Sequence, residues 1–427
     1  MKEKLLQFIW QQQYFNRSDL QSSNGEELQV INPGTLNFNQ GPDFINATIK
    51  IGNTTWVGNI EIHLRSGIWY LHNHDNDTNF NNIILHVVWK HDLEVKDGNG
   101  TLLPTLELHQ RVPKFLLSKY ETLMSSSEFI PCGKTISKIN ALTLESWKQR
   151  LVIERLQKRT GRILTLLNQN NNHWDETFWW LLATNFGMKV NGIAFESISR
   201  SLPQKILAKH RNQLIQVEAL LLGQAGLLNE DFNSKYAILL QKEYQFLSAK
   251  YSLKQIDTPI LFLRMRPSNF PTLRLAQLAA LIANTEHLFS KILSFNTVLE
   301  VRNVFKIMPN DHWNYHYTLD NPSEYKVKYL GNQMIENIII NTVIPLIFAY
   351  GKFHNEHSLM DKALSWMENC SAEKNVITNG FANLDLPHKN AFDSQAFIQL
   401  KNEYCKHKRC LNCAVGNSLL KMQDPLN

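Results

Sequence analysis

The sequence predicts an α+β protein: a mixed α/β domain with a small central sheet over residues 1–130, then a larger, mainly α-helical domain over residues 131–427. Short apolar runs with period-two alternation fill the first part, whereas helical periodicity begins at Ala141. The charge changes as well. Of the 44 Lys+Arg and 38 Asp+Glu, residues 1–130 hold 10 and 14, which leaves 34 and 24 for the remainder. With 427 residues and 43% hydrophobic composition, the chain is long enough for two or three domains with sizeable cores.

The N-terminal domain is expected to begin with one helix and continue through strands. Alternation and Gly/Asn/Asp/Pro turn signals mark the strand boundaries. The predicted elements are a helix over 5–15 that packs on the sheet, a strand over 27–31, a hairpin of strands 46–51 and 54–64 around Gly52-Asn53, a short apolar segment at 68–70, a buried strand over 83–89, and a second hairpin over 93–109.

The first hairpin gathers acidic and imidazole groups. If it folds about residue 52, Asp43 lies opposite Glu61, and the pairing requires an odd loop or a β-bulge. Alternation then places Glu61 and His63 on one face of their strand, while Ile60 and Ile62 point into a core. Such an oxygen-rich group suits Mg²⁺ or Mn²⁺, which activate water and hold phosphate.

This layout resembles the PD-(D/E)XK nuclease-like superfamily, through Pro42-Asp43 and Glu61-Ile62-His63. The resemblance implies a metal-dependent nuclease acting on DNA or RNA, with Asp43 and Glu61 as metal ligands and Glu26 or Glu27 as the upstream acid. The superfamily's lysine position holds His63, which can act as a base or orienting group but brings no fixed positive charge.

Other interpretations of the same region stay open. Glu61 and His63 could form a hydrogen-bonded pair on a solvated sheet face. The run His72-x-His74-Asp75-x-Asp77, together with His86, supplies ligands for a zinc-dependent hydrolase. Against that reading, the run is also typical of a polar loop, and a histidine inside a buried strand is often a core residue.

The helical domain carries basic residues in two places. A long helix is predicted over 142–168, and further helices are expected near 178–182, 195–202, 214–222, 236–250 and 273–292. Phosphate contact by these basic residues is one interpretation, and solvated or ion-paired side chains are the other. The candidate nucleic-acid-binding residues are Arg155, Lys158, Arg159 and Arg162, spaced on one face of the long helix, and Arg264 and Arg266 before the last helix, with Arg274 in its first turn.

Three cysteines, Cys405, Cys410 and Cys413, form a C-x4-C-x2-C arrangement among lysines and arginines near the C-terminus. Cationic surroundings favour thiolate ligands. A closed site needs a fourth ligand, for which Cys132 is the better candidate and Cys370 or His407 the alternatives. Four cysteines suit zinc or an iron–sulfur cluster. Simple buried thiols are the other interpretation.

No window reaches the roughly 18 apolar residues of a membrane span. The N-terminus lacks the pattern of a signal peptide, and the five cysteines do not form a secreted disulfide framework. We therefore expect a cytoplasmic protein without membrane partners, and the sequence does not indicate an oligomeric state.

Over nearly its full length the chain resembles an uncharacterised bacterial family, catalogued as domain of unknown function 2851. That resemblance implies no activity. The preferred function is therefore metal-dependent nuclease action, and the rival is a non-catalytic nucleic-acid-binding or scaffold protein with a structural metal. The residues that carry the resemblance are Asn37, 41–44, 58–63, 72–88, 185–187, 223–226, 266–271 and 405–416.

Overall fold

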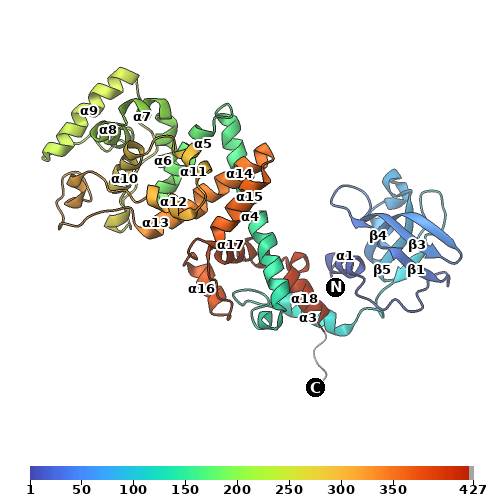
Figure 1. Cartoon of the computed structure of the whole chain (residues 1–427). Coiled ribbons are helices and arrows are strands. Elements are labelled where there is room, and N and C mark those ends of the chain that lie inside the picture. Colours follow the sequence, from blue (N-terminus) through green and yellow to red (C-terminus); the bar gives the residue numbers. More distant parts are fainter. Residues whose placement is uncertain (423–427) are drawn as a thin grey trace. The chain divides into compact units, whose positions relative to one another are not determined.

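The computed structural model describes residues 1–422, which fold into two compact units (Figure 1). The first unit contains Met1–Trp147 and the C-terminal segment from Leu400 onward; the second is Lys148–Gln399. The division therefore falls inside α4 (Ala141–Gln169), later than residue 130, and the C-terminal cysteines belong to the first unit. The predicted α+β class is confirmed, because the strands of the main sheet lie in the first unit and helices make up most of the second.

The first unit is built on one mixed sheet of six strands. The strand order is β1-β3-β4-β5-β6, and β2 also pairs with β3. β3 pairs antiparallel with β1 and β4, whereas β5 runs parallel to both β4 and β6. The strands are β1 (Leu28–Asn32), β2 (Thr35–Leu36), β3 (Phe44–Ile51), β4 (Thr54–Arg65), β5 (Ile83–Lys90) and β6 (Thr105–Glu107).

The hairpin of β3 and β4 contains the bulge that its pattern requires. Ile51 pairs with Thr54 across the two-residue turn, and this register holds as far as Ala47 opposite Gly58. It then shifts by one residue, so that Phe44 lies opposite Ile60. Asn46, inside the shift, has a φ of 58°, a left-handed conformation that asparagine tolerates well. The predicted placement of Asp43 beside Glu61 is confirmed.

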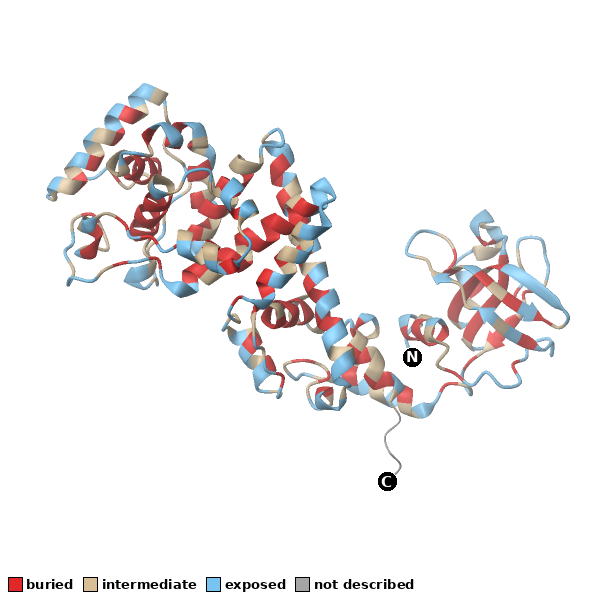
Figure 2. Cartoon of the chain, in the orientation of Figure 1, coloured by how far each residue is buried: buried red, intermediate tan, exposed pale blue. Residues whose placement is uncertain are grey.

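The sheet is buried most deeply along β4 and β5 (Figure 2). Residues 60–63 and 83–88 are all buried, as expected for strands covered on both faces. Helix α1 (Glu3–Gln12) packs against β4 with a buried side that includes Leu6 and Ile9, so the predicted N-terminal helix is confirmed. Glu61 and His63 are therefore not on a solvated face.

Two segments differ from the sequence prediction. Residues 68–71 form a short helix, α2, and two 3₁₀ turns follow at His74–Asn76 and Thr78–Phe80 before β5 begins. The second predicted hairpin is reduced to a single antiparallel bridge between Lys96 and Leu102. Its far arm becomes β6, which runs parallel to β5 instead of folding back on the near arm.

The second unit surrounds two apolar helices, α8 (Leu214–Gln224) and α10 (Pro271–Asn284), which pack on each other. In α10, the eleven residues 271–281 are all buried, so this helix has no solvated side. The other helices are α5 (Trp174–Phe186), α6 (Met188–Ser201), α7 (Gln204–His210), α9 (Lys235–Tyr251), α11 (Leu288–Ser294), α12 (Val298–Val304), α13 (Asn332–Ile338), α14 (Ile344–His354), α15 (His357–Glu368), α16 (Val376–Ala382) and α17 (Ala391–Gln399).

The helical run Asn332–His354 passes through a π-helical segment between α13 and α14. By length and composition it could cross a membrane, and 78% of its apolar window is buried inside the protein. In the first unit, helices α3 (Lys114–Ser125) and α18 (Ala414–Lys421) pack on each other.

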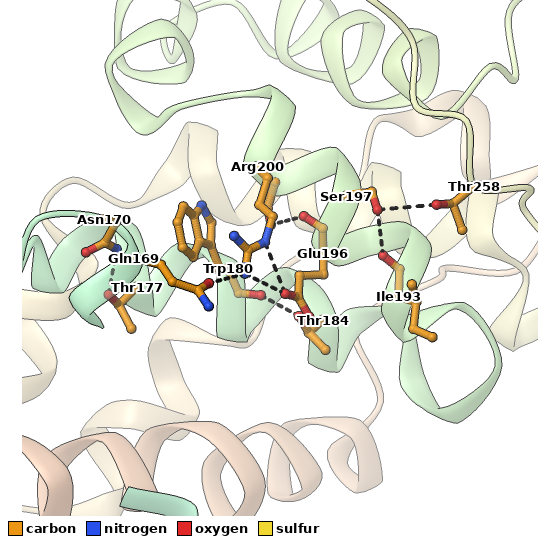
Figure 3. A network of polar contacts seen from close by, with 11 residues as sticks. Gln169, Asn170, Thr177, Trp180, Thr184, Ile193, Glu196, Ser197, Arg200 and Thr258 are labelled. Atoms are coloured by element: carbon orange, nitrogen blue, oxygen red, sulfur yellow. Dashed lines mark hydrogen bonds and ion pairs between the residues drawn. The ribbon is translucent and has the colours of Figure 1, made fainter. Parts of the chain in front are cut away.

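A polar network joins the end of α4 to α5 and α6 (Figure 3). The Arg200 guanidinium donates to Glu196 Oε1 at 2.9 Å and to Gln169 Oε1 at 3.0 Å. It also lies 4.2 Å above the Trp180 ring, a cation–π distance. One arginine of α6 thus contacts α4 through Gln169 and α5 through Trp180.

A buried carboxyl lies deep in the second unit. Glu218 of α8 is fully buried and accepts hydrogen bonds from the Tyr236 hydroxyl and from Trp313 Nε1. Burial raises the pKa of Glu218 to about 7, although the two hydrogen bonds act in the opposite direction. Ionisation of this group is therefore opposed in the folded state.

This raised pKa predicts a pH-dependent stability. Between the ordinary glutamate pKa and pH 7 the folded state holds a proton that the unfolded chain has lost, so stability falls as pH rises. Between pH 5 and pH 8, we expect the unfolding free energy of the wild type to fall by about 2 to 3 kcal/mol more than that of Glu218→Gln. Urea unfolding of both proteins at several pH values measures this, and parallel pH profiles would contradict it.

Candidate metal site

Imidazole and carboxyl groups meet at the end of β4 where the chain leaves the sheet. Glu61 and His63 lie two residues apart on this strand and so share one face. His72 follows α2, and His74 begins the next 3₁₀ turn. The short path from β4 to β5 therefore returns two histidines to the strand that supplies the other two groups.

The three histidines converge on one point. One ring nitrogen from each of His63, His72 and His74 lies within 4.8 Å of the other two. His63 Nε2 is 3.3 Å from His72 Nδ1, and Glu61 Oε1 is 3.5 Å from both His63 Nε2 and His74 Nε2. Three imidazole nitrogens at these separations, with a carboxylate oxygen beside them, suit a transition-metal ion.

His74 supports this interpretation. Both of its ring nitrogens are buried, and neither has a hydrogen-bond partner among residues 1–422. The ring is held by contact with Phe80, whose centroid is 3.8 Å away, and with Trp69 at 5.3 Å. Buried polar atoms rarely lack a hydrogen bond in folded proteins, so this imidazole, held by aromatic rings, is a candidate metal ligand.

His86 orients one of the three imidazoles. It lies on β5 directly opposite Glu61, fully buried, with Nε2 2.9 Å from His63 Nδ1. For His63 Nε2 to offer its lone pair to a metal, its Nδ1 must carry the proton and donate to His86. Metal-binding histidines usually have such a partner on the second nitrogen. Burial, and then the nearby imidazoles, lower the pKa of His63 to about 2 and that of His86 to about 3, so both rings stay neutral and able to serve these roles.

Asp43 and Glu61 are joined through the backbone. The Asp43 N–H donates to Glu61 Oε2 at 3.0 Å, and the Ile62 N–H donates to Asp43 Oδ2 at 3.2 Å. Gln7 of α1 donates to Asp43 Oδ1 at 2.8 Å. Burial and then the charge of Glu61 raise the pKa of Asp43 to about 7. Both Asp43 oxygens are thus engaged within the protein, while Glu61 keeps Oε1 toward the histidines.

Glu3, which was not among the residues predicted from the sequence, also lies here. Glu3, in the first turn of α1, has a raised pKa because of burial and then the charge of Glu61, and the charges of His72 and His74 oppose that rise. The spacing of Glu3 and Gln7 was the available signal, because residues four apart share one face of a helix. Nothing in the sequence indicated that this face meets β4.

The predicted upstream acids, Glu26 and Glu27, therefore do not lie at the site. Glu26 and Glu27 are exposed and lie beside the β3–β4 turn, where the Gly52 N–H donates to the Glu27 carbonyl. Asp43 precedes the opposite end of β3, roughly 25 Å along the strand. Asp77 is not one of the converging ligands, and its side chain caps the turn Thr78–Phe80.

The predicted basic residues divide into two groups. Arg155 donates to Gln395, and Arg159 donates to the Ile340 carbonyl and to Asn341, so both hold helices of the second unit together. Burial lowers the pKa of Arg159 to about 9. Those that remain exposed are Lys158, Arg162, Arg264 and Arg266, whereas Arg274 is buried and donates to Asn269 and Gln277.

Comparison with known proteins gives one match. A family model described as "Protein of unknown function (DUF2851)" matches residues 3–376. No curated protein matches the chain, and no solved structure does.

The geometry predicts a metal affinity that depends on His74 and, indirectly, on His86. We expect His74→Ala to abolish Mn²⁺ binding, because it removes a ligand. His86→Leu should weaken binding by about 10- to 100-fold, because it leaves His63 Nδ1 without an acceptor. Calorimetric titration with Mn²⁺, which thiolates bind poorly, measures both. The exposed His109 provides the control His109→Ala, and equal affinity in all three variants would contradict the assignment.

Proposed function

The chain belongs to the DUF2851 family, and we propose that it is a metal-dependent hydrolase that cleaves phosphodiester bonds of DNA or RNA. The observation that carries the proposal is the convergence of three histidine nitrogens with Glu61 Oε1, in a cluster that is buried at His63 and open at His72. In a purely structural cluster the ring nitrogens would have hydrogen-bond partners within the protein, whereas those of His74 have none among residues 1–422.

The donor set favours Mn²⁺ or Zn²⁺ over Mg²⁺. Imidazole is a good ligand for the first two, whereas Mg²⁺ prefers oxygen donors and water. Three histidines with one further position for water is the arrangement of catalytic zinc sites. A metal bound here would lower the pKa of its water and polarise a phosphoryl oxygen.

The protein groups then have distinct roles. Glu61 Oε1 lies where it can take the proton from an attacking water, as Oε2 is already occupied by the Asp43 N–H. Asp43 positions this carboxylate and fixes the β4 backbone through Ile62. His86 fixes the tautomer of His63. As water oxygen bonds to phosphorus, its proton passes to Glu61, and the bond from phosphorus to the leaving oxygen breaks.

Three features support a phosphodiester as the substrate. The arrangement of Asp43 and Glu61 resembles that of PD-(D/E)XK nucleases, and Glu3 supplies an acid from the preceding helix. In addition, the 297 residues that follow residue 130 carry 34 basic against 24 acidic residues, which favours attraction of a polyanion.

One observation favours a second candidate, a non-catalytic nucleic-acid-binding or scaffold protein with a structural metal. Both Asp43 oxygens accept hydrogen bonds from the protein, so this carboxylate is not free to bind a metal as it would in the nuclease arrangement. His63 also brings no fixed positive charge to a scissile phosphate.

An activity assay separates the two candidates. With Mn²⁺ or Zn²⁺ and single- and double-stranded DNA and RNA, we expect cleavage that falls by about 100-fold or more in Glu61→Gln, which removes the base. His74→Ala should lose cleavage together with metal. Glu27→Gln is the control, since Glu27 is an exposed acid at the far end of the same sheet.

The outcomes are distinct. Equal activity in Glu61→Gln and wild type would exclude Glu61 as the base. Metal binding and nucleic-acid binding without cleavage would favour the non-catalytic protein. Hydrolysis of small esters, with nucleic acid left intact, would identify a zinc hydrolase with another substrate.

Nucleic-acid binding can be tested separately. We expect the double variant Lys158→Glu/Arg162→Glu to weaken binding and to reduce the salt dependence of affinity by about one unit of slope per lost phosphate contact. Lys254→Glu, an exposed lysine outside the predicted basic sites, controls for the change in charge. Fluorescence anisotropy at several salt concentrations measures both quantities. Unchanged slopes would exclude this face of α4 as a surface that contacts phosphates.

A further inference from the structure

Four of the five cysteines lie in the first unit, although Cys132 is far along the sequence from the other three. Cys132 lies in the segment after α3, and the other three are near the C-terminus. Burial, followed by the nearby Cys413 and Cys410 thiols, raises the pKa of Cys132 to about 12. The pKa of Cys405 is raised by burial and then by Cys132, Cys413 and Cys410. Each sulfur therefore lies within electrostatic range of the others, and none forms a disulfide.

Lysine side chains hold the two segments together. Lys401 donates to the Phe129 carbonyl, and Lys408 donates to the Met124 carbonyl, which anchors the C-terminal segment beside the segment that carries Cys132. Gly416 permits a close approach, because a Cβ there would lie 2.2 Å from the carbonyl oxygen of Cys410. The loop between Cys410 and α18 is thus compact.

The thiols are buried together. Cys132, Cys410 and Cys413 are each less than a tenth exposed. Burial raises the pKa of the Cys413 thiol, which lies at the N-cap of α18.

The separation of the sulfurs distinguishes between metals. Four thiolates on one zinc, with Zn–S near 2.3 Å, lie about 3.8 Å apart in a tetrahedron. Within residues 1–422, the group of three or more His, Cys, Asp or Glu ligand atoms that all lie within 4.8 Å is the histidine cluster. The cysteines form no such group. The C-x4-C-x2-C spacing with a distant fourth cysteine is that of plant-type [2Fe–2S] sites, in which the sulfurs bind two different irons.

We infer that Cys132, Cys405, Cys410 and Cys413 ligate an iron–sulfur cluster, which fastens the C-terminal segment to the segment after α3. Each cysteine loses its proton and gives one iron–sulfur bond. The site is separate from the histidine cluster and does not depend on the proposed hydrolase activity. Cys370, buried in the second unit, is not one of its ligands.

The test begins with the wild-type protein purified without oxygen. We expect two or four irons, with as many acid-labile sulfides, per chain and a visible absorption band typical of thiolate–iron charge transfer. Cys132→Ser and Cys405→Ser should each lose most of the iron and the band. Cys370→Ser, the matched control, should keep both. Removal of the cluster should also speed tryptic cleavage between Lys401 and Lys408.

Stoichiometric zinc without iron or sulfide in the wild-type protein would overturn the inference, and so would metal-free wild type after reconstitution with iron and sulfide. An intact cluster in Cys132→Ser would remove Cys132 from the ligand set. The wild-type measurement needs no variant, so the inference can be tested even if Cys132→Ser fails to fold.

Discussion

The bulge in β3 determines what the end of this sheet can do. A regular two-residue hairpin would place Asp43 out of step with Glu61, and the extra residue at Asn46 restores the match. The Asp43 N–H then reaches Glu61 Oε2, and this leaves Oε1 directed at the histidines. Asp43, His63 and His74 all contact this carboxylate, which belongs to the central strand of the sheet.

Without a cation, the carboxyl groups around the cluster repel one another. Glu3, Asp43 and Glu61 bring like charges together in a poorly solvated place, which raises the pKa of the first two. Burial meanwhile keeps His63 neutral, so this imidazole does not compensate them. A bound cation would oppose the repulsion and could take one ring nitrogen of His74 as a ligand. The arrangement that disfavours the metal-free site would therefore favour a bound metal.

The first unit is also closed by its own C-terminus. Tyr14, just after α1, donates to Asn417 of α18 at 2.8 Å, and Lys401 reaches back to the Phe129 carbonyl. A four-cysteine cluster would strengthen this closure, because a bond between distant parts of a chain mainly restricts the unfolded state. The helix that carries Glu3 is thus linked to the segment that carries the cysteines.

The sequence by itself determined the local features of this protein. Alternation predicted β3 and β4, an apolar run predicted the buried strand β5, and helical periodicity predicted α4 almost to the residue. The pairing of Asp43 with Glu61 followed as well, because hairpin register depends on neighbouring residues.

Only the tertiary structure decided which distant groups join them. Glu3 instead of Glu27 lies at the site because of how α1 packs on β4. His72 reaches His63, and His74 reaches Glu61, because α2 turns the chain back toward the sheet. Arg159, which spacing alone assigns to a basic stripe, is half-buried and donates to Asn341. Sequence periodicity reports which side of an element is apolar, but it contains no information about which other element covers that side.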